Sequence, residues 1–108
     1  QPLPEMDEKK LLQLILGSVH DEIGKDRAEE LAKRASWEEC AADLKKVKFL
    51  YLIDSQIGES GATALAKAVE AGRHDGLQVL NLGGNQIGDS GATALAKAIE
   101  AGRLEGLQ

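Results

Sequence analysis

The chain has 108 residues, which is the length of one small domain. Eighteen acidic and thirteen basic residues give a formal net charge of −5, and this sign disfavours attraction to phosphate backbones, so we expect no nucleic-acid partner. The single cysteine excludes an internal disulfide framework, and no histidine and cysteine cluster has metal-ligand spacing, so we expect neither a metal nor another cofactor.

The cysteine count also bears on the compartment. One cysteine suits a reducing environment, so we expect a cytoplasmic protein, with a secreted protein that lacks disulfides as the alternative. No apolar run is long enough to span a bilayer, and no basic-then-apolar signal segment opens the sequence, so we expect no membrane partner. The chain starts with Gln1 and stops at Gln108, just as a third copy of the strand segment begins, which suggests an excised or trimmed piece of a longer protein.

The beginning of the chain predicts a helical region. Apolar residues recur at helical spacing between about Met6 and about Ile23, which favours one helix there. A glycine weakens this helix, and a short strand over residues 13–16 is the alternative. Pro2 and Pro4 indicate an extended start to the chain.

A second helical segment precedes the repeats. Residues 23–33 match the repeated segment described below at an offset of 34 residues, which suggests a degenerate repeat with a four-residue insertion and a charged outer face. Ser36 starts a capping box that predicts a helix from Trp37 to about Lys46. We therefore expect residues 1–46 to form a helical N-terminal cap, with Trp37 closing the apolar edge of the first repeat.

The remainder of the chain is a repeat. Residues 57–78 recur as residues 87–108, at an offset of 30 residues, and only four of the 22 aligned positions differ. A fixed period of this size indicates stacked units, each of which covers the apolar face that its neighbour leaves open. We expect about two repeats over residues 47–108, the last one truncated.

The strand segment of each copy carries a family pattern. Residues 77–87 read L-x-x-L-x-L-x-x-N-x-I, and residues 47–57 keep this apolar frame with Ser55 in place of Asn85. The pattern resembles the leucine-rich repeat signature, and the Gly-Asp/Glu-Ser-Gly-Ala segment that follows resembles its ribonuclease-inhibitor-like subclass. The resemblance implies an α/β fold: a short solenoid with a parallel inner sheet and outer helices. The period of 30 residues slightly exceeds the roughly 20–29 usual for the family.

The spacing within each copy points to the same elements. Leu80 and Leu82 alternate as in a short strand whose leucines face inward. A helix is expected over residues 90–101, and Gly102 lies where a helix end favours a left-handed glycine. Residues at positions i, i+3, i+4 and i+7 of this helix form its apolar face: Ala92, Leu95, Ala96 and Ile99.

The short motifs do not predict an enzyme. The glycine-rich segments lack the spacing of a phosphate-binding loop, and the Gly-Asp-Ser-Gly segment is one residue short of a hydrolase elbow. Ser60 and Ser90 suit the first turns of helices. Cys40 lies on a predicted helix among alanines and predicts a buried free thiol. His20 and His74 are surrounded by charge, which predicts surface histidines.

The candidate binding residues lie on the outward face of the predicted sheet. Exposed aromatic side chains on a sheet face suggest contact with a partner, with cover by the N-terminal cap, a crystal contact or a dimer contact as the alternative. Five residues make up this candidate surface, which the resemblance makes concave: Phe49, Tyr51, Ile53, Val79 and Asn81. By the same resemblance, Asn85 is a structural rung whose amide donates to carbonyl groups of adjacent turns.

These observations predict a protein-interaction module, either a fragment of a longer leucine-rich-repeat protein or an engineered repeat scaffold. A structural or design fragment with no natural partner is one alternative. A GTPase-activating regulator is another, implied by family resemblance, although no functional residue of such proteins can be placed on this sequence. Because no terminal cap follows the second copy, we also expect a homodimer through the C-terminal end, with a longer parent array as the alternative means of covering it.

Overall fold

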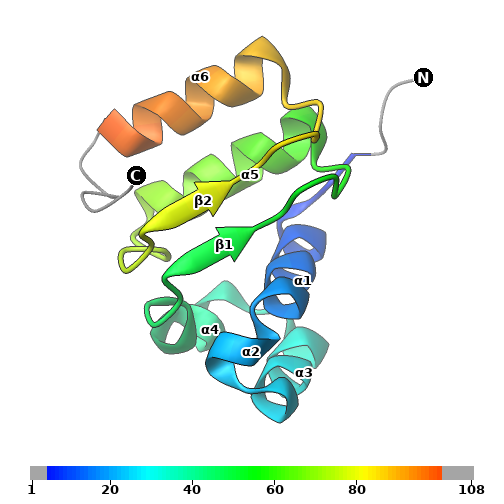
Figure 1. Ribbon diagram of the computed structural model, residues 1–108, viewed down its shortest axis with the longest axis vertical. Coiled ribbons are helices and arrows are strands. Elements are labelled where there is room, and N and C mark those ends of the chain that lie inside the picture. The colour runs from blue at the N-terminus through cyan, green and yellow to red at the C-terminus, as the bar shows by residue number, and fades with distance from the viewer. Residues whose placement is uncertain (1–4, 101–108) are drawn as a thin grey trace.

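The computed structural model describes residues 5–100, and these form a helical first part followed by two strand-helix units (Figure 1). The expectations for Pro2, Pro4 and Gly102 lie outside the described residues. In chain order the elements are α1 (Glu8–Ser18), α2 (His20–Ile23), α3 (Lys25–Arg34), α4 (Trp37–Leu44), β1 (Phe49–Tyr51), α5 (Gly58–Glu70), β2 (Val79–Asn81) and α6 (Gly88–Ala98).

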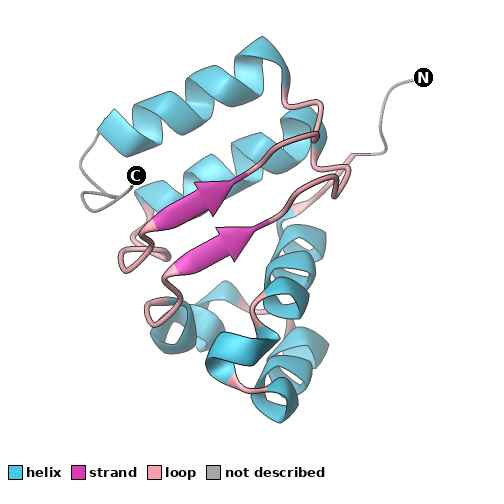
Figure 2. Ribbon diagram, viewed as in Figure 1, coloured by secondary structure: helices cyan, strands magenta, loops and turns pink. Residues whose placement is uncertain are grey.

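The two strands form a small parallel sheet (Figure 2). Leu50 lies opposite Leu80, so both copies contribute the same position to the sheet. Parallel neighbours need a crossover connection, and α5 supplies it. Helices α5 and α6 pack side by side on one face of the sheet (Figure 1). The fold is therefore mixed α/β, mostly helical, with the parallel sheet that the sequence predicted.

The core joins the helical first part to the two copies. Leucine and isoleucine on one side of α1 are fully buried and pack with the inward leucines of β1 and its turn. Burial of an aliphatic side chain contributes about 1.5–3 kcal/mol, so this shared core holds the two parts together. The fully buried members from these segments are Leu11, Leu12, Ile15, Leu16, Leu50 and Leu52.

The single helix expected over residues 6–23 is wrong, and so is the strand alternative inside it. Helix α1 begins after Asp7, whose carboxylate accepts from the N–H of Lys10 at 2.8 Å. It ends at Ser18, whose hydroxyl donates to the Ile15 carbonyl at 2.8 Å, and Val19 then leaves helical geometry with φ −113° and ψ 16°. A side chain that bonds a carbonyl of its own helix favours such a break, and α2 starts after it at His20.

The repeat helices also differ from the prediction at their starts. Both begin two residues before the serines, at Gly58 and Gly88, whose φ angles of 64° and 73° favour glycine. The Ser60 hydroxyl does not cap α5 but accepts from the N–H of Met6 at 2.8 Å. On α6, Leu95 is buried as expected, whereas two members of the predicted apolar face are exposed: Ala92 and Ala96.

Candidate functional site

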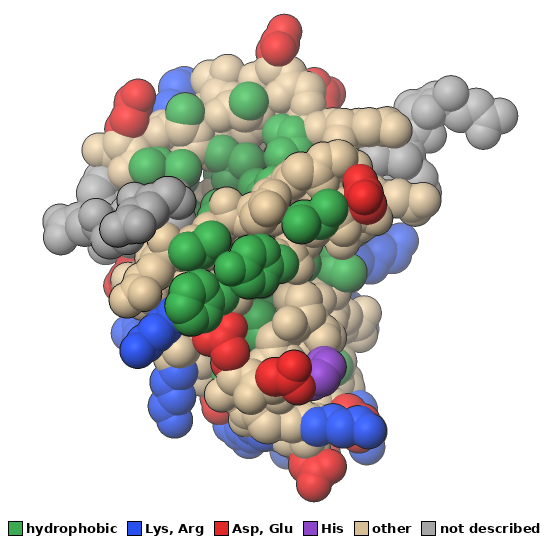
Figure 3. Space-filling view, in the orientation of Figure 1, with side chains coloured by type: hydrophobic (Ala, Val, Ile, Leu, Met, Phe, Trp, Pro, Cys, Tyr) green, Lys and Arg blue, Asp and Glu red, His purple; other side chains and the backbone are tan. Residues whose placement is uncertain are grey.

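The outward face of the sheet carries large exposed apolar side chains. Phe49, Tyr51 and Ile53 are 43%, 54% and 50% exposed, and hydrophobic side chains gather over the front of the strands in Figure 3. Strand geometry causes this, because successive side chains point to opposite faces and the intervening Leu50 and Leu52 are buried. The aromatic and isoleucine side chains therefore form one apolar patch.

Strand β2 continues this patch with smaller and more polar side chains. In the sheet register, Phe49 lies opposite Val79 and Tyr51 lies opposite Asn81. Val79 is half-buried and Asn81 is exposed. The structure thus brings the five candidate binding residues onto one surface, which we call the strand face: Phe49, Tyr51, Ile53, Val79 and Asn81.

Polar groups border the strand face. The Glu22 carboxylate accepts from the backbone N–H of Lys48 at 3.0 Å, which fixes α2 beside the start of β1. The Asn81 side-chain oxygen accepts from the N–H of Gly83 at 3.0 Å. Within residues 5–100, the Asn81 NH₂ group has no hydrogen-bond partner. An apolar centre with free polar groups at its edge is the usual composition of a protein-binding surface.

Asn85 lies behind the strand face and holds the two turns together. It is 2% exposed, and its NH₂ group donates to the Leu52 carbonyl at 2.6 Å. Its side-chain oxygen accepts from the N–H groups of Ser55 at 2.7 Å and Ile57 at 3.4 Å. The amide therefore satisfies buried backbone groups of the preceding copy, which gives Asn85 a structural rather than a binding role.

The prediction of a surface position for His74 is wrong. His74 is 0% exposed, and neither ring nitrogen has a hydrogen-bond partner in the described structure. Its ring meets that of Trp37 in an edge-on contact, with centroids 6.1 Å apart and planes at 85°. Burial lowers the pKa of His74 to about 4, so the ring is neutral at pH 7, and nearby Asp75 opposes this shift only in part.

The sequence contained a signal for this burial. The second copy has Leu104 where the first has His74, so the position suits an apolar side chain. His20, in contrast, is exposed, which confirms the prediction of a surface histidine. Its ring nitrogen lies 2.9 Å from the Asp21 carboxylate.

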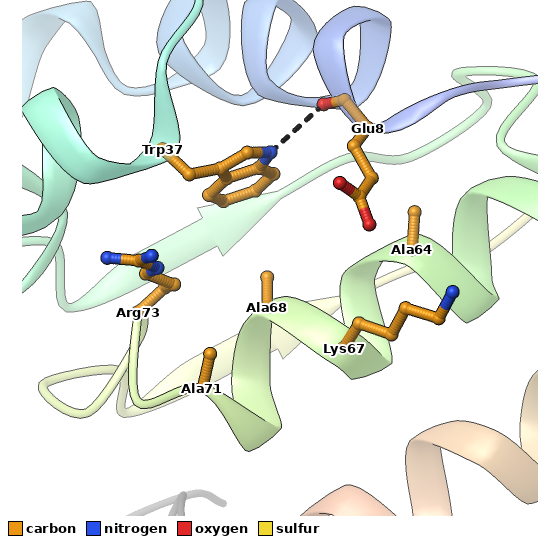
Figure 4. A pocket seen from close by; sticks show the side chains of 7 residues that line it. All are labelled: Glu8, Trp37, Ala64, Lys67, Ala68, Ala71 and Arg73. Atoms are coloured by element: carbon orange, nitrogen blue, oxygen red, sulfur yellow. Dashed lines mark hydrogen bonds between the residues drawn. The ribbon is translucent and has the colours of Figure 1, made fainter.

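Trp37 lies at the junction between α4 and α5. It is half-buried, and its ring N–H donates to the Glu8 carbonyl at 3.2 Å. Alanines on one side of α5 face the tryptophan across a cavity of about 140 Å³ (Figure 4). The residues that line this cavity are Glu8, Trp37, Ala64, Lys67, Ala68, Ala71 and Arg73.

The free thiol of the chain lies in the core. Cys40 is buried, as expected, and burial with Asp43 nearby raises the pKa of its thiol, so it is not an activated nucleophile. Among residues 5–100, no group of three or more His, Cys, Asp or Glu side chains is placed to hold a metal ion. Across the same residues, every helix is too short or too polar to span a bilayer.

Comparison with known proteins gives one match. A family model described as Leucine Rich repeat matches residues 77–96, which covers β2, the turn with Asn85 and most of α6. This match supports a leucine-rich repeat protein, and such repeats generally mediate protein–protein interaction. No curated protein and no solved structure matched the chain.

Proposed function

We propose that the chain is a protein-interaction module that binds its partner through the strand face. The observation that carries this proposal is the exposure of Phe49 and Tyr51 on one side of β1 and of Ile53 in the turn after it, each at least 43%. Aromatic side chains held rigidly by a sheet lose little conformational freedom on binding, so they are effective anchors. The leucine-rich repeat match supports binding rather than catalysis.

The electrostatics of the strand face suit a protein partner better than a charged polymer. Its five residues carry no formal charge, and the Glu22 carboxylate beside the start of β1 is already bonded to the Lys48 N–H. Charged residues are depleted at the centres of protein interfaces. We therefore expect an apolar segment of a protein to occupy the centre of the face, with the Asn81 NH₂ group bonding the partner at the edge.

Several finer features belong to the same proposal. We propose a short solenoid of the ribonuclease-inhibitor-like subclass, with residues 1–46 as a helical cap and residues 47–108 as the repeats. The strand face is then its concave side. We further propose a cytoplasmic protein, because a single buried free thiol suits a reducing compartment. The chain is either a piece of a longer repeat protein or an engineered scaffold.

The test is a matched pair of double variants on opposite faces. Proteins cross-linked to the wild-type chain through a photoreactive group beside Tyr51 are identified, and the binding of each is then measured by titration. Phe49→Ser with Tyr51→Ser should weaken binding at least about tenfold, since removing an aromatic anchor costs about 1–2 kcal/mol or more. The helical content measured by circular dichroism should not change.

The control double variant changes exposed residues of α5, Lys67→Ser with Glu70→Ser. It should bind as the wild type does. Equal losses in the two double variants would show that the strand face is not the binding surface.

A further inference from the structure

The cavity of about 140 Å³ beside Trp37, which we call the junction cavity, has one aromatic wall and one wall of methyl groups. The indole ring of Trp37 forms the first wall, and alanines of α5 form the second (Figure 4). These alanines stand at positions i, i+4 and i+7, so their methyl groups lie on one side of the helix: Ala64, Ala68 and Ala71. Two apolar walls that face each other suit a flat apolar group between them.

The two sides of α5 differ in how closely they are packed. On the side of α6, a Cβ atom added to Gly91 would lie 2.9 Å from the Cβ of Ala62, so no space remains there. On the side of Trp37, the junction cavity remains. A dry apolar cavity of about 150 Å³ holds one benzene molecule. Because protein interiors are normally filled, a space of this size beside a tryptophan indicates a ligand site.

The aromatic wall is held in place by two contacts. The Trp37 ring N–H donates to the Glu8 carbonyl at 3.2 Å. The ring also meets the buried ring of His74 edge-on, with centroids 6.1 Å apart. A side chain that is already fixed loses little conformational freedom when a ligand binds. The indole face is therefore ready to pack against an aromatic ring.

The charged residues of the junction cavity favour an anion. Two basic residues, Lys67 and Arg73, and one acidic residue, Glu8, line it. Arg73 is half-buried, and within residues 5–100 its guanidinium group forms no ion pair. A guanidinium group binds a carboxylate through two parallel hydrogen bonds. Glu8 lies at the other end of the cavity (Figure 4), and it is exposed, so water screens its charge.

We propose that the junction cavity binds a small aromatic carboxylate, which is a single six-membered ring that carries one carboxylate group. The ring packs between Trp37 and the alanines of α5, and the carboxylate accepts two hydrogen bonds from Arg73. A free acid fits better than a segment of a protein, because the cavity has the volume of one ring. The junction cavity is separate from the strand face, so this inference does not rest on the proposed function.

The experiment uses the fluorescence of Trp37, which is the single tryptophan of the chain. Benzoate added to the wild-type protein should change the emission until it saturates, with a dissociation constant of about 1 mM or below. Benzamide keeps the ring without the charge, and it should bind at least about tenfold more weakly. Acetate keeps the charge without the ring, and it should also bind at least about tenfold more weakly.

Three variants separate the charge from the shape. Arg73→Gln should weaken benzoate binding at least about tenfold and leave benzamide binding unchanged, because only benzoate uses the guanidinium group. Lys97→Gln removes an equal charge from an exposed position of α6 outside the cavity, so it should bind benzoate as the wild type does. Ala71→Leu fills the cavity from an exposed position and should weaken the binding of both compounds. Circular dichroism should show the same helical content in all three.

Four results would overturn the proposal. The first is the absence of a saturable response to benzoate, and the second is equal binding of benzoate and benzamide or acetate. The third is an equal loss in Arg73→Gln and Lys97→Gln, which would reduce the effect to net charge. The fourth is tighter binding of N-acetyl-phenylalanine than of benzoate, because this compound stands for the last residue of a protein and would assign the cavity to a protein terminus.

Discussion

Two nearly identical helices of this molecule have different surroundings. In α5, both the side that faces the N-terminal helices and the side that faces α6 are covered, and the alanines of the helix are buried. In α6, the equivalents of Ala62 and Ala66 are exposed, namely Ala92 and Ala96, whereas Ala98 remains buried. Identical sequence thus gives identical local structure, but burial and stability depend on the neighbouring unit.

The N-terminal region replaces a preceding repeat for α5. The Met6 N–H donates to the Ser60 hydroxyl, and the Met6 sulfur lies 3.2 Å from where a Cβ on Gly61 would be. Gly61 in the first copy therefore takes a contact from a non-repeated segment, whereas Gly91 takes one from Ala62. A glycine at this position serves close packing in both copies, although the neighbour differs.

The largest expected difference between the copies concerns their inward leucines. Leu52→Ala should cost about 3 kcal/mol of unfolding free energy, because Leu52 is 1% exposed and the change leaves a cavity. Leu82→Ala, at a partly exposed position, should cost about half as much. Urea denaturation of both variants measures this difference, and equal costs would show that the second copy is as well covered as the first.

Acid should destabilise the protein through His74 of the first copy. The pKa of His74 is about 4 in the folded protein, against 6.5 for a histidine in water, so between these values the unfolded chain binds a proton that the folded chain does not. Stability should therefore fall as the pH is lowered from about 7 to about 4, by about 3 kcal/mol in total.

The matched variant for this effect is His74→Leu, which installs the residue of the second copy. In this variant, the unfolding free energy should change little over this pH range, because most of the wild-type decrease comes from His74. His20→Leu changes an exposed histidine and should retain the decrease. A wild-type stability that is flat between pH 7 and pH 4 would mean that His74 takes up its proton without leaving its site.

The features that the sequence predicted correctly depend on local periodicity, and those that it did not predict depend on hydrogen bonds and contacts that periodicity does not describe. The strand-helix units, the inward leucines and the exposure of Phe49 and Tyr51 follow from local periodicity, which the sequence contains directly. The break at Val19 depends on a side-chain hydrogen bond that competes with the helix, which periodicity does not include. The burial of His74 depends on a contact with Trp37 across the fold, although comparison with Leu104 already indicated an apolar position.

A smaller effect is expected where the two copies differ in sequence. Asn85→Ala should cost about 2 kcal/mol, because it leaves the buried N–H of Ile57 and the carbonyl of Leu52 without partners. Ser55→Ala removes only a hydroxyl that bonds the exposed Ile53 carbonyl, so its cost should stay within about 0.5 kcal/mol. Similar costs from the two changes, measured by thermal unfolding, would remove the structural role given to Asn85.

The smallest expected difference compares the same substitution, alanine to serine, at a buried position of α5 and at the equivalent exposed position of α6. Serine in place of alanine lowers helix propensity by about 0.5 kcal/mol wherever it stands in a helix interior, so Ala62→Ser and Ala92→Ser share this cost. Ala62 is 0% exposed and lies against Gly91, so its new hydroxyl must be buried, which adds about 1 kcal/mol or more unless it bonds a carbonyl of its own helix. Ala92 is exposed, and its hydroxyl stays in water. We expect Ala62→Ser to cost about 1 kcal/mol more than Ala92→Ser in urea denaturation, and equal costs would contradict the difference in burial between the helices.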